Sequence, residues 1–328
     1  MSTVLGVQLR FEGYRDPKAM GKALKQPASK PARELIAQTL AALECQAVDS
    51  AAVTLVITGK FGKSIDRRTP PGSPPYDTDR LSGIAAARTM PRGHGKVDVI
   101  VPGPFVFGTP GEQPGQRAAR AARLTYMATH EAQHVGMYQR GERLMEGPHH
   151  YLGQGTASHD FRATAEIVLE EYRAEAAAAR LCTPPEPYWE SVPSALKGLR
   201  AALVDAVELR YPDEPIRRTW LTAFGAAHNT WVVMGYLAGN LQAAGSAAAV
   251  PDELASSELW QRFVQLHWSD FADLCGALSA GDEACTAEAL GATVAGLSEL
   301  LGVWLQSIGF ELSDTEDGLY FDVLRHDF

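Results

Sequence analysis

Residues 130–134 read His-Glu-Ala-Gln-His, and this short motif restricts what the surrounding chain can fold into. Positions i and i+4 of an α-helix lie on one face, so His130 and His134 can hold one metal ion only if this segment is helical. Glu131, between them, can then reach a water molecule at the metal. Because the motif also arises by chance, its weight depends on the neighbouring sequence.

The segment from Gly115 to Gly141 is typical of a long helix. It contains no proline and is rich in alanine, arginine and glutamine, with methionine and leucine besides, all of which favour helices. Arginine recurs at every third position, which indicates a solvated face, at Arg117, Arg120 and Arg123. The two histidines share a different face with apolar residues, namely Tyr126, Met127, Met137 and Tyr138. The histidines are therefore expected among apolar side chains, and Gly141 is expected to end the helix.

A second helical segment, from Asp160 to Cys182, offers a third ligand. Asp160, or Ser158 just before it, is expected to cap this helix. On a helical wheel Glu171 lies within the apolar stripe, where a carboxylate is costly unless it is paired or binds a metal. The wheel places five residues on the other side, namely Glu166, Glu170, Arg173, Ala177 and Arg180, and of these Glu166 and Glu170 are expected to be solvated surface charges.

Glu175 follows Glu171 by one turn on the same stripe. A metal-bound histidine usually donates its second ring N–H to a carboxylate, so Glu175 is the candidate to orient one of the two histidines. The small residues Ala174 and Ala178 would let the two helices approach closely. The alternative is that Glu171 and Glu175 form a surface row that pairs with arginine.

His130-Glu131-x-x-His134 followed by Glu171-x-x-x-Glu175 resembles the gluzincin branch of the zincin metallopeptidases. Members of that branch carry H-E-x-x-H on one helix and E-x-x-x-D on the next, so this chain departs from the pattern at Glu175. The resemblance implies that His130, His134 and Glu171 bind Zn²⁺. It also implies that Glu131 is the general base and that the substrate is a peptide or amide bond.

The resemblance extends over roughly residues 50–182 and implies a small mixed sheet ahead of the metal-binding helices. Two β-branched runs, Val53–Thr58 and Val97–Val101, have the composition of strands, and residues 86–90 are a candidate third strand. A helix is predicted over residues 31–46. In zincins an edge strand holds an extended peptide by strand addition. Val97–Val101 is the candidate for that strand here, with an ordinary core strand as the alternative.

A proline-rich stretch at residues 183–189 predicts two domains, a zincin-like metal-binding domain at 1–182 and a helical domain at 183–328. Helices are predicted beyond it over residues 194–209, 215–243, 252–279 and 286–308. Residues 309–328 are expected to form a hairpin or a packed tail. The predicted fold class is therefore α+β, with a zincin-like upper lobe followed by a mainly α-helical C-terminal lobe.

The resemblance also implies a residue that stabilises the oxyanion, since gluzincins often use a histidine or tyrosine of their helical lower lobe. His228, on an apolar helix, is the first candidate for this second catalytic role. A hydrogen-bonded core histidine is the simpler interpretation of His228. His149, His150 and Tyr151, after the metal-binding helix, are competing candidates.

Composition disfavours several other functions. The formal net charge is −9, and the modest basic excess of the first 125 residues lacks interleaved aromatic residues, so nucleic-acid binding is not expected. No apolar run approaches the roughly 18 residues of a membrane span, and the first residues do not resemble a secretory signal. A cytoplasmic protein without a membrane partner is therefore expected. The four cysteines form no C-x-x-C pair, so no cysteine zinc site is predicted.

Three functional hypotheses remain open from the sequence. The first is a zinc-dependent hydrolase, most simply a metallopeptidase. The second is a zincin fold that binds zinc but acts on a small metabolite or serves a regulatory interaction. The third is a di-iron helical bundle, because Glu131-x-x-His134 is also an E-x-x-H motif. That site needs a second copy, and the other copy, Glu146-Gly147-Pro148-His149, has an interior that disfavours a helix.

Overall fold

The chain forms two compact units in the computed structural model. The structure describes residues 6–70, 79–80, 83–84, 87–109, 111–143, 156–185, 190–208, 216–245, 249–316 and 318–325. The first unit consists of residues 1–79, 84–148 and 177–185, and the second of residues 80–83, 149–176 and 186–328. Helix α6, Ala157–Leu181, contributes to both units. The predicted domains, 1–182 and 183–328, stay a prediction.

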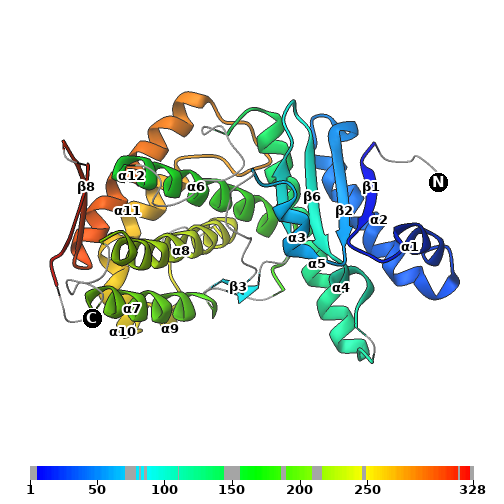
Figure 1. Ribbon diagram of the computed structural model, residues 1–328, viewed down its shortest axis with the longest axis horizontal. Helices are drawn as coiled ribbons and strands as arrows, with labels where there is room; N and C mark the ends of the chain where they lie inside the picture. Colours follow the sequence, from blue (N-terminus) through cyan, green and yellow to red (C-terminus); the bar gives the residue numbers. More distant parts are fainter. Residues whose placement is uncertain are drawn as a thin grey trace. The chain divides into compact units, whose positions relative to one another are not determined.

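The first unit is built on a four-stranded mixed sheet in the order β1-β2-β6-β5 (Figure 1). Its strands are β1 (Gln8–Glu12), β2 (Val53–Thr58), β5 (Arg88–Pro91) and β6 (Val97–Pro102). β1, β2 and β6 run parallel, and β5 is antiparallel to β6. The three strands that the sequence predicts are confirmed, whereas β1 is not predicted. The mixed sheet followed by a mostly helical remainder confirms the α+β class.

β6 lies inside the sheet, so the interpretation of Val97–Val101 as an edge strand is wrong. It pairs with β2 on one side and with β5 on the other, and each of these five residues is buried. The edge strands of this sheet are β1 and β5. A strand that is buried on both faces needs a nearly continuous apolar sequence, which explains why β6 has a stronger strand signal than β5.

The two faces of this sheet are covered by different helices. The helices concerned are α2 (Lys30–Gln46), α3 (Phe61–Asp66) and α5 (Pro114–Gln139). Leu55 and Val99 belong to the larger core, which includes residues of α2 and α5. Val56 and Ile100, which alternate with them, pack with Ile65 of α3 on the opposite face. The predicted helix over residues 31–46 is confirmed as α2.

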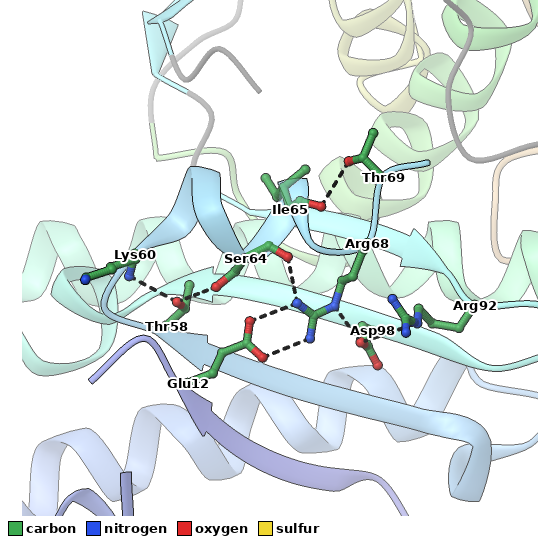
Figure 2. Close-up of polar contacts among 9 residues, drawn as sticks. All are labelled: Glu12, Thr58, Lys60, Ser64, Ile65, Arg68, Thr69, Arg92 and Asp98. Atoms are coloured by element: carbon green, nitrogen blue, oxygen red, sulfur yellow. Dashed lines mark hydrogen bonds and ion pairs between the residues drawn. The ribbon is translucent and has the colours of Figure 1, made fainter. Parts of the chain in front are cut away.

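An arginine whose side chain is only 5 % exposed connects the segment after α3 to two strands of the sheet (Figure 2). Arg68 donates two hydrogen bonds to the Glu12 carboxylate, at 2.8 and 3.1 Å, and one to Asp98 at 2.6 Å. Burial raises the pKa of Glu12, but hydrogen bonds from Arg68 and Ser64 lower it, and the net shift is downward. Removing the arginine would leave two carboxylates on β1 and β6 without this partner, so the cluster holds α3 on the sheet.

Shorter elements connect these parts of the chain. They are α1 (Pro17–Ala23), α4 (Gly103–Phe107), two 3₁₀ turns (Pro27–Ser29 and Ser50–Ala52), and β3 (Asp79–Arg80) and β4 (Gly83–Ile84), which form a separate two-stranded sheet.

The second unit is mainly helical, and α7 and α8 lie side by side in it (Figure 1). Besides α6 its helices are α7 (Val192–Glu208), α8 (Ile216–Ala243), α9 (Asp252–Ala255), α10 (Glu258–Phe263), α11 (Gln265–Gly276) and α12 (Ala287–Ser307). Trp231 of α8 makes edge contacts with Phe271 of α11 and Trp304 of α12. Large aromatic side chains therefore join three helices of this core.

The single helix predicted over residues 252–279 is wrong, because this segment forms α9, α10 and α11. Ser257 accepts a hydrogen bond from the N–H of Trp260 and so starts a new helix at α10. Val264, with φ −124°, interrupts the helical backbone between α10 and α11. The helices predicted over 194–209, 215–243 and 286–308 are confirmed as α7, α8 and α12.

The C-terminal residues form a hairpin, one of the two predicted alternatives. Its strands, β7 (Phe310–Thr315) and β8 (Gly318–Val323), are antiparallel. Phe310 stacks on Phe321 across the hairpin, and Phe321 also contacts Trp220 of α8. The hairpin is therefore packed on the helices of its own unit.

Within the part of the chain that the structure describes, one helix, α12, is long and apolar enough to cross a membrane by length and composition alone. Of its most apolar window, 39 % is buried inside the structure, and the helix contains Glu299. Its buried residues recur with the helical period, at Leu290, Val294, Leu297, Leu301 and Trp304. A core helix passes the same test, so this is weak evidence for a span, and the expected lack of a membrane partner stays a prediction.

Candidate metal centre

Helix α5 carries the His-Glu-x-x-His motif, as the sequence predicts. A capping box between Gln113 and Gln116 starts the helix, and Gly141, in the left-handed conformation with φ 76°, follows its end. The N-terminal half of α5 is mostly exposed, and the half that bears the motif is mostly buried. His130 and Glu131 are buried, and His134 is half-buried. The motif therefore lies in the buried half of the helix.

The two imidazoles of α5 face each other. The Nε2 atoms of His130 and His134 lie 3.2 Å apart, and the two rings are inclined by 67°. Two nitrogens that each bind one tetrahedral zinc ion at about 2.0–2.1 Å would lie about 3.3–3.4 Å apart. The observed separation therefore suits two ligands of one ion.

Glu171 of α6 completes a group of three possible ligands. His130, His134 and Glu171 each offer one ligand atom, and these atoms all lie within 4.8 Å of one another. Among the described residues this is the one such group of three or more histidines, cysteines or carboxylates. Two imidazoles and a carboxylate suit Zn²⁺ and other divalent first-row metals. The prediction that these three residues come together is confirmed.

Helix α6 is enclosed on nearly every side, because residues 171–178 are all buried. Glu166 is also buried, so the prediction that it is a solvated surface charge is wrong, and Glu170 is half-buried. Arg173, on the same side of the helix, is buried as well. Arg173 donates hydrogen bonds to the carbonyl oxygens of Ser279, at 2.9 Å, and Glu283, at 2.8 Å. A helical wheel cannot distinguish a charge in water from a charge with partners inside the protein.

The N-terminus of α6 is capped by the C-terminal hairpin. Asp314 of β7 accepts hydrogen bonds from the N–H groups of Ala157, at 2.6 Å, and Ser158, at 3.1 Å. Burial raises the pKa of Asp314, but hydrogen bonds from Ser158 and Ala157 lower it, and the net shift is downward. The prediction that Asp160 or Ser158 is the cap is wrong, because the helix begins earlier and Asp160 lies buried within its first turn.

Two glycines of α8 lie against the backbone of α6. A β-carbon added at Gly239 would lie 2.5 Å from the carbonyl oxygen of Tyr172 and 2.9 Å from the amide nitrogen of Ala176. One added at Gly235 would lie 2.9 Å from the carbonyl oxygen of Val168. Glycines four residues apart share one helix face, so α8 can approach α6 on both sides of Glu171.

Glu175 lies in this tightly packed part of α6. It is fully buried, and its Oε1 accepts a hydrogen bond of 3.5 Å from Asn240 of α8. A buried carboxylate needs such partners, and Asn240 is one that the sequence alone does not indicate. Because Glu171 and Glu175 are both buried, the alternative of an exposed row of carboxylates is wrong. The role of Glu175 toward one of the histidines stays a prediction.

The edge strand β5 contacts the candidate general base. The Thr89 hydroxyl lies 2.6 Å from Oε2 of Glu131 and 3.2 Å from the carbonyl oxygen of the same residue. Thr89 is not among the site residues that the sequence predicts. The sequence does hold one indication of it: Thr89 is a polar residue next to Met90 in a predicted strand, and neighbouring residues of a strand lie on opposite faces of the sheet.

Of the four candidates for oxyanion stabilisation, the structure describes His228. His228 is half-buried on α8, and its Nδ1 lies 3.1 Å from the hydroxyl of Thr164 on α6. Its catalytic role stays a prediction. His149, His150 and Tyr151, and the second E-x-x-H of the di-iron hypothesis, lie outside the described residues.

Comparison of the chain with protein-family models, with curated proteins and with solved structures gave no match. The likeness to gluzincins therefore rests on the motif and on the three side chains that the structure gathers, His130, His134 and Glu171.

Proposed function

We propose that this protein is a zinc-dependent hydrolase in which His130, His134 and Glu171 hold the ion and Glu131 is the general base. The observation that carries the proposal is the gathering of the three ligand atoms within 4.8 Å of one another. Structural zinc sites almost always use four protein ligands, whereas catalytic sites use three and keep one position for water or substrate. A set of two histidines and one glutamate is of the catalytic type.

The residues around the ion have separate roles in this proposal. A bound zinc ion supplies a Lewis acid that polarises a carbonyl group and makes a water molecule more acidic. Glu131 follows His130 directly in α5 and is buried beside it. Its carboxylate accepts a proton from the attacking water and then delivers that proton to the leaving amine.

We propose peptide or amide bonds as the substrate class, with the zincin-like arrangement of sheet and helices as the scaffold. The support is the order of H-E-x-x-H and a later glutamate on two successive helices, α5 and α6, behind a mixed sheet. The substitution of Glu175 for the aspartate of the gluzincin pattern keeps a carboxylate at that position, and this carboxylate is buried.

Elemental analysis of the purified full chain, combined with a peptide-library assay, tests the proposal. We expect about one zinc per chain in the wild type and its loss in Glu171→Ala, because a ligand is removed. Glu170→Ala, at the half-exposed neighbouring position of α6, is the matched control and should keep the zinc. Glu131→Gln should also keep the zinc but lose hydrolysis by a factor of about 10²–10⁴.

Each other outcome contradicts a defined part of the proposal. Normal zinc binding by Glu171→Ala would contradict the ligand set, and normal hydrolysis by Glu131→Gln would contradict the general base. Zinc binding without hydrolysis of any peptide would contradict the peptidase and favour a small metabolite or a regulatory interaction. Bound iron with a visible absorption band would favour the di-iron alternative.

A further inference from the structure

Thr89 projects from the edge strand toward the helix that bears the motif. In the pairing of β5 with β6, Thr89 is opposite Val99, which belongs to the core on the α5 face of the sheet. The next residue, Met90, packs with Ile65 on the other face. Because side chains alternate along a strand, the Thr89 hydroxyl lies on the α5 face, where it contacts Glu131.

The strand is attached to α5 at two separate points. Thr89 contacts Glu131 at one of them. At the other, the Gln139 side chain donates hydrogen bonds of 3.0 Å to the carbonyl oxygens of Gly95, in the turn between β5 and β6, and of Asp49. Glu131 and Gln139 are about 12 Å apart along the helix axis. The strand therefore cannot slide along the helix without breaking one of these contacts.

The contact with Thr89 makes the two carboxylate oxygens of Glu131 different. Oε2 lies 2.6 Å from the hydroxyl, a length typical of an O–H donor bound to a carboxylate. Oε1 receives no hydrogen bond from any residue within the described part of the chain. One oxygen is thus held by the sheet, and the other is available for proton transfer.

We propose that Thr89 is a positioning residue for the general base, and this inference rests on the proposed function. Its hydroxyl holds Oε2 and thereby restricts the side-chain torsions of Glu131, so that Oε1 is presented in one orientation. A general base must lie within hydrogen-bond reach of the proton that it takes, and small errors in its position are costly. The edge strand, through Thr89, supplies that restriction from outside the helix.

Three variants of the zinc-loaded full chain test the inference. Thr89→Val keeps the shape of the side chain and removes the hydroxyl, Thr89→Ser keeps the hydroxyl, and Glu131→Gln removes the base. The measurements are zinc content, unfolding temperature, kcat and KM for a peptide identified by the library, and the affinity for acetohydroxamate by calorimetry. Acetohydroxamate chelates zinc and passes a proton to a neighbouring base, so its binding reports on Glu131 without turnover.

We expect Thr89→Val to lower kcat about ten- to hundredfold at nearly unchanged KM, because a hydrogen bond to a charged group is lost. Its affinity for acetohydroxamate should fall about tenfold, with zinc content and unfolding temperature near those of the wild type. Thr89→Ser should stay within about threefold of the wild type in both measurements. If Thr89→Val fails to fold, Thr89→Ala, which also lacks the hydroxyl but adds no bulk, takes its place.

Two failures are distinguishable. If Glu131→Gln is impaired while Thr89→Val behaves as the wild type, the inference about Thr89 is overturned and the hydrolase proposal stands. If Glu131→Gln also behaves as the wild type, the proposed function fails and the inference fails with it. An equal loss in Thr89→Ser and Thr89→Val would overturn the inference as well, because the hydroxyl would then not be the group that matters.

Discussion

The two helices that supply the candidate metal ligands are held in different ways. α5 is exposed along its N-terminal half, and the half that carries the motif is buried almost all round in the core that it shares with α2 and the sheet. α6 is buried almost all round in the region of Glu171, and its partners come from α8, from the loop at residues 279–283 and from β7. A helix of the first kind can be recognised from its own sequence. The position of a helix of the second kind depends on residues far along the chain.

The largest effect is expected where α8 approaches α6. Gly239→Ala would place a β-carbon 2.5 Å from the carbonyl oxygen of Tyr172, and backbone on both sides leaves little room to yield. We expect the free energy of unfolding to fall by about 3 kcal/mol. We also expect weaker zinc binding, because Glu171 precedes Tyr172 on the helix that is displaced. Chemical denaturation and zinc titration measure the two effects.

Gly225→Ala is the matched control for this substitution. Gly225 lies in the same helix, and a β-carbon added there meets no atom within 4 Å. It should leave zinc binding unchanged and raise the free energy of unfolding by up to about 1 kcal/mol, through better helix propensity. If the two glycine variants behave alike, α6 is not enclosed as tightly as the comparison with α5 requires.

The same substitution in each helix compares them directly. Arg173→Met in α6 removes the hydrogen bonds to Ser279 and Glu283, and we expect a loss of about 2 kcal/mol in the free energy of unfolding. Arg117→Met in α5 removes a side chain that is 55 % exposed and lies 4.0 Å from Glu112, so the change should stay within about 0.5 kcal/mol. Equal losses in denaturant melts of the two variants would contradict the distinction between the helices.

The smallest effect concerns the cap of α6. Asp314→Asn weakens the cap formed by the hairpin, and we expect a loss of about 1 kcal/mol in the free energy of unfolding at neutral pH. Glu311→Gln, on the same strand, is the control and should have little effect.

The Asp314 cap should also be pH-dependent. The folded pKa of Asp314 lies below its ordinary value of 3.8, so its stabilising contribution is complete above that pH. It is lost as the pH falls below 3.8 through the folded pKa. The difference between the wild type and Asp314→Asn should therefore shrink in acid. Melts at pH 7 and below pH 3.8 test this, and a difference that grows in acid would contradict it.

Local patterns account for what could be predicted of the fold. β2 and β6 are buried on both faces and carry nearly continuous apolar runs, interrupted by Thr54 and Asp98, and α5 repeats arginine at every third position of its exposed half, so each has a recognisable pattern. β1 (Gln8–Glu12) alternates Leu9 and Phe11 with polar residues, and this pattern of five residues is too short to distinguish a strand from chance. The break of residues 252–276 into three helices depends on the Ser257 cap and the backbone at Val264, which periodicity does not report.

The residues of the candidate site also differ in whether local sequence patterns predict them. His130, His134 and Glu171 could be predicted because metal chemistry and helical spacing select residue types at fixed intervals. Thr89 could not be assigned to Glu131, because their contact depends on the register of β5 against β6. The partners of Arg173 and the cap at Asp314 likewise require the tertiary structure.

The hairpin contact of Asp314 bears on how the protein is made. A ribosome releases the imidazole pair of α5 long before it releases β7, so a nascent chain exposes His130 and His134 while α6 still lacks the contacts of Asp314 with its N-terminus. In such a chain the two histidines are accessible to metal ions, but the carboxylate of Glu171 is not yet held opposite them. Under the proposed function, fragments that end before the hairpin should therefore bind zinc more weakly than the full chain.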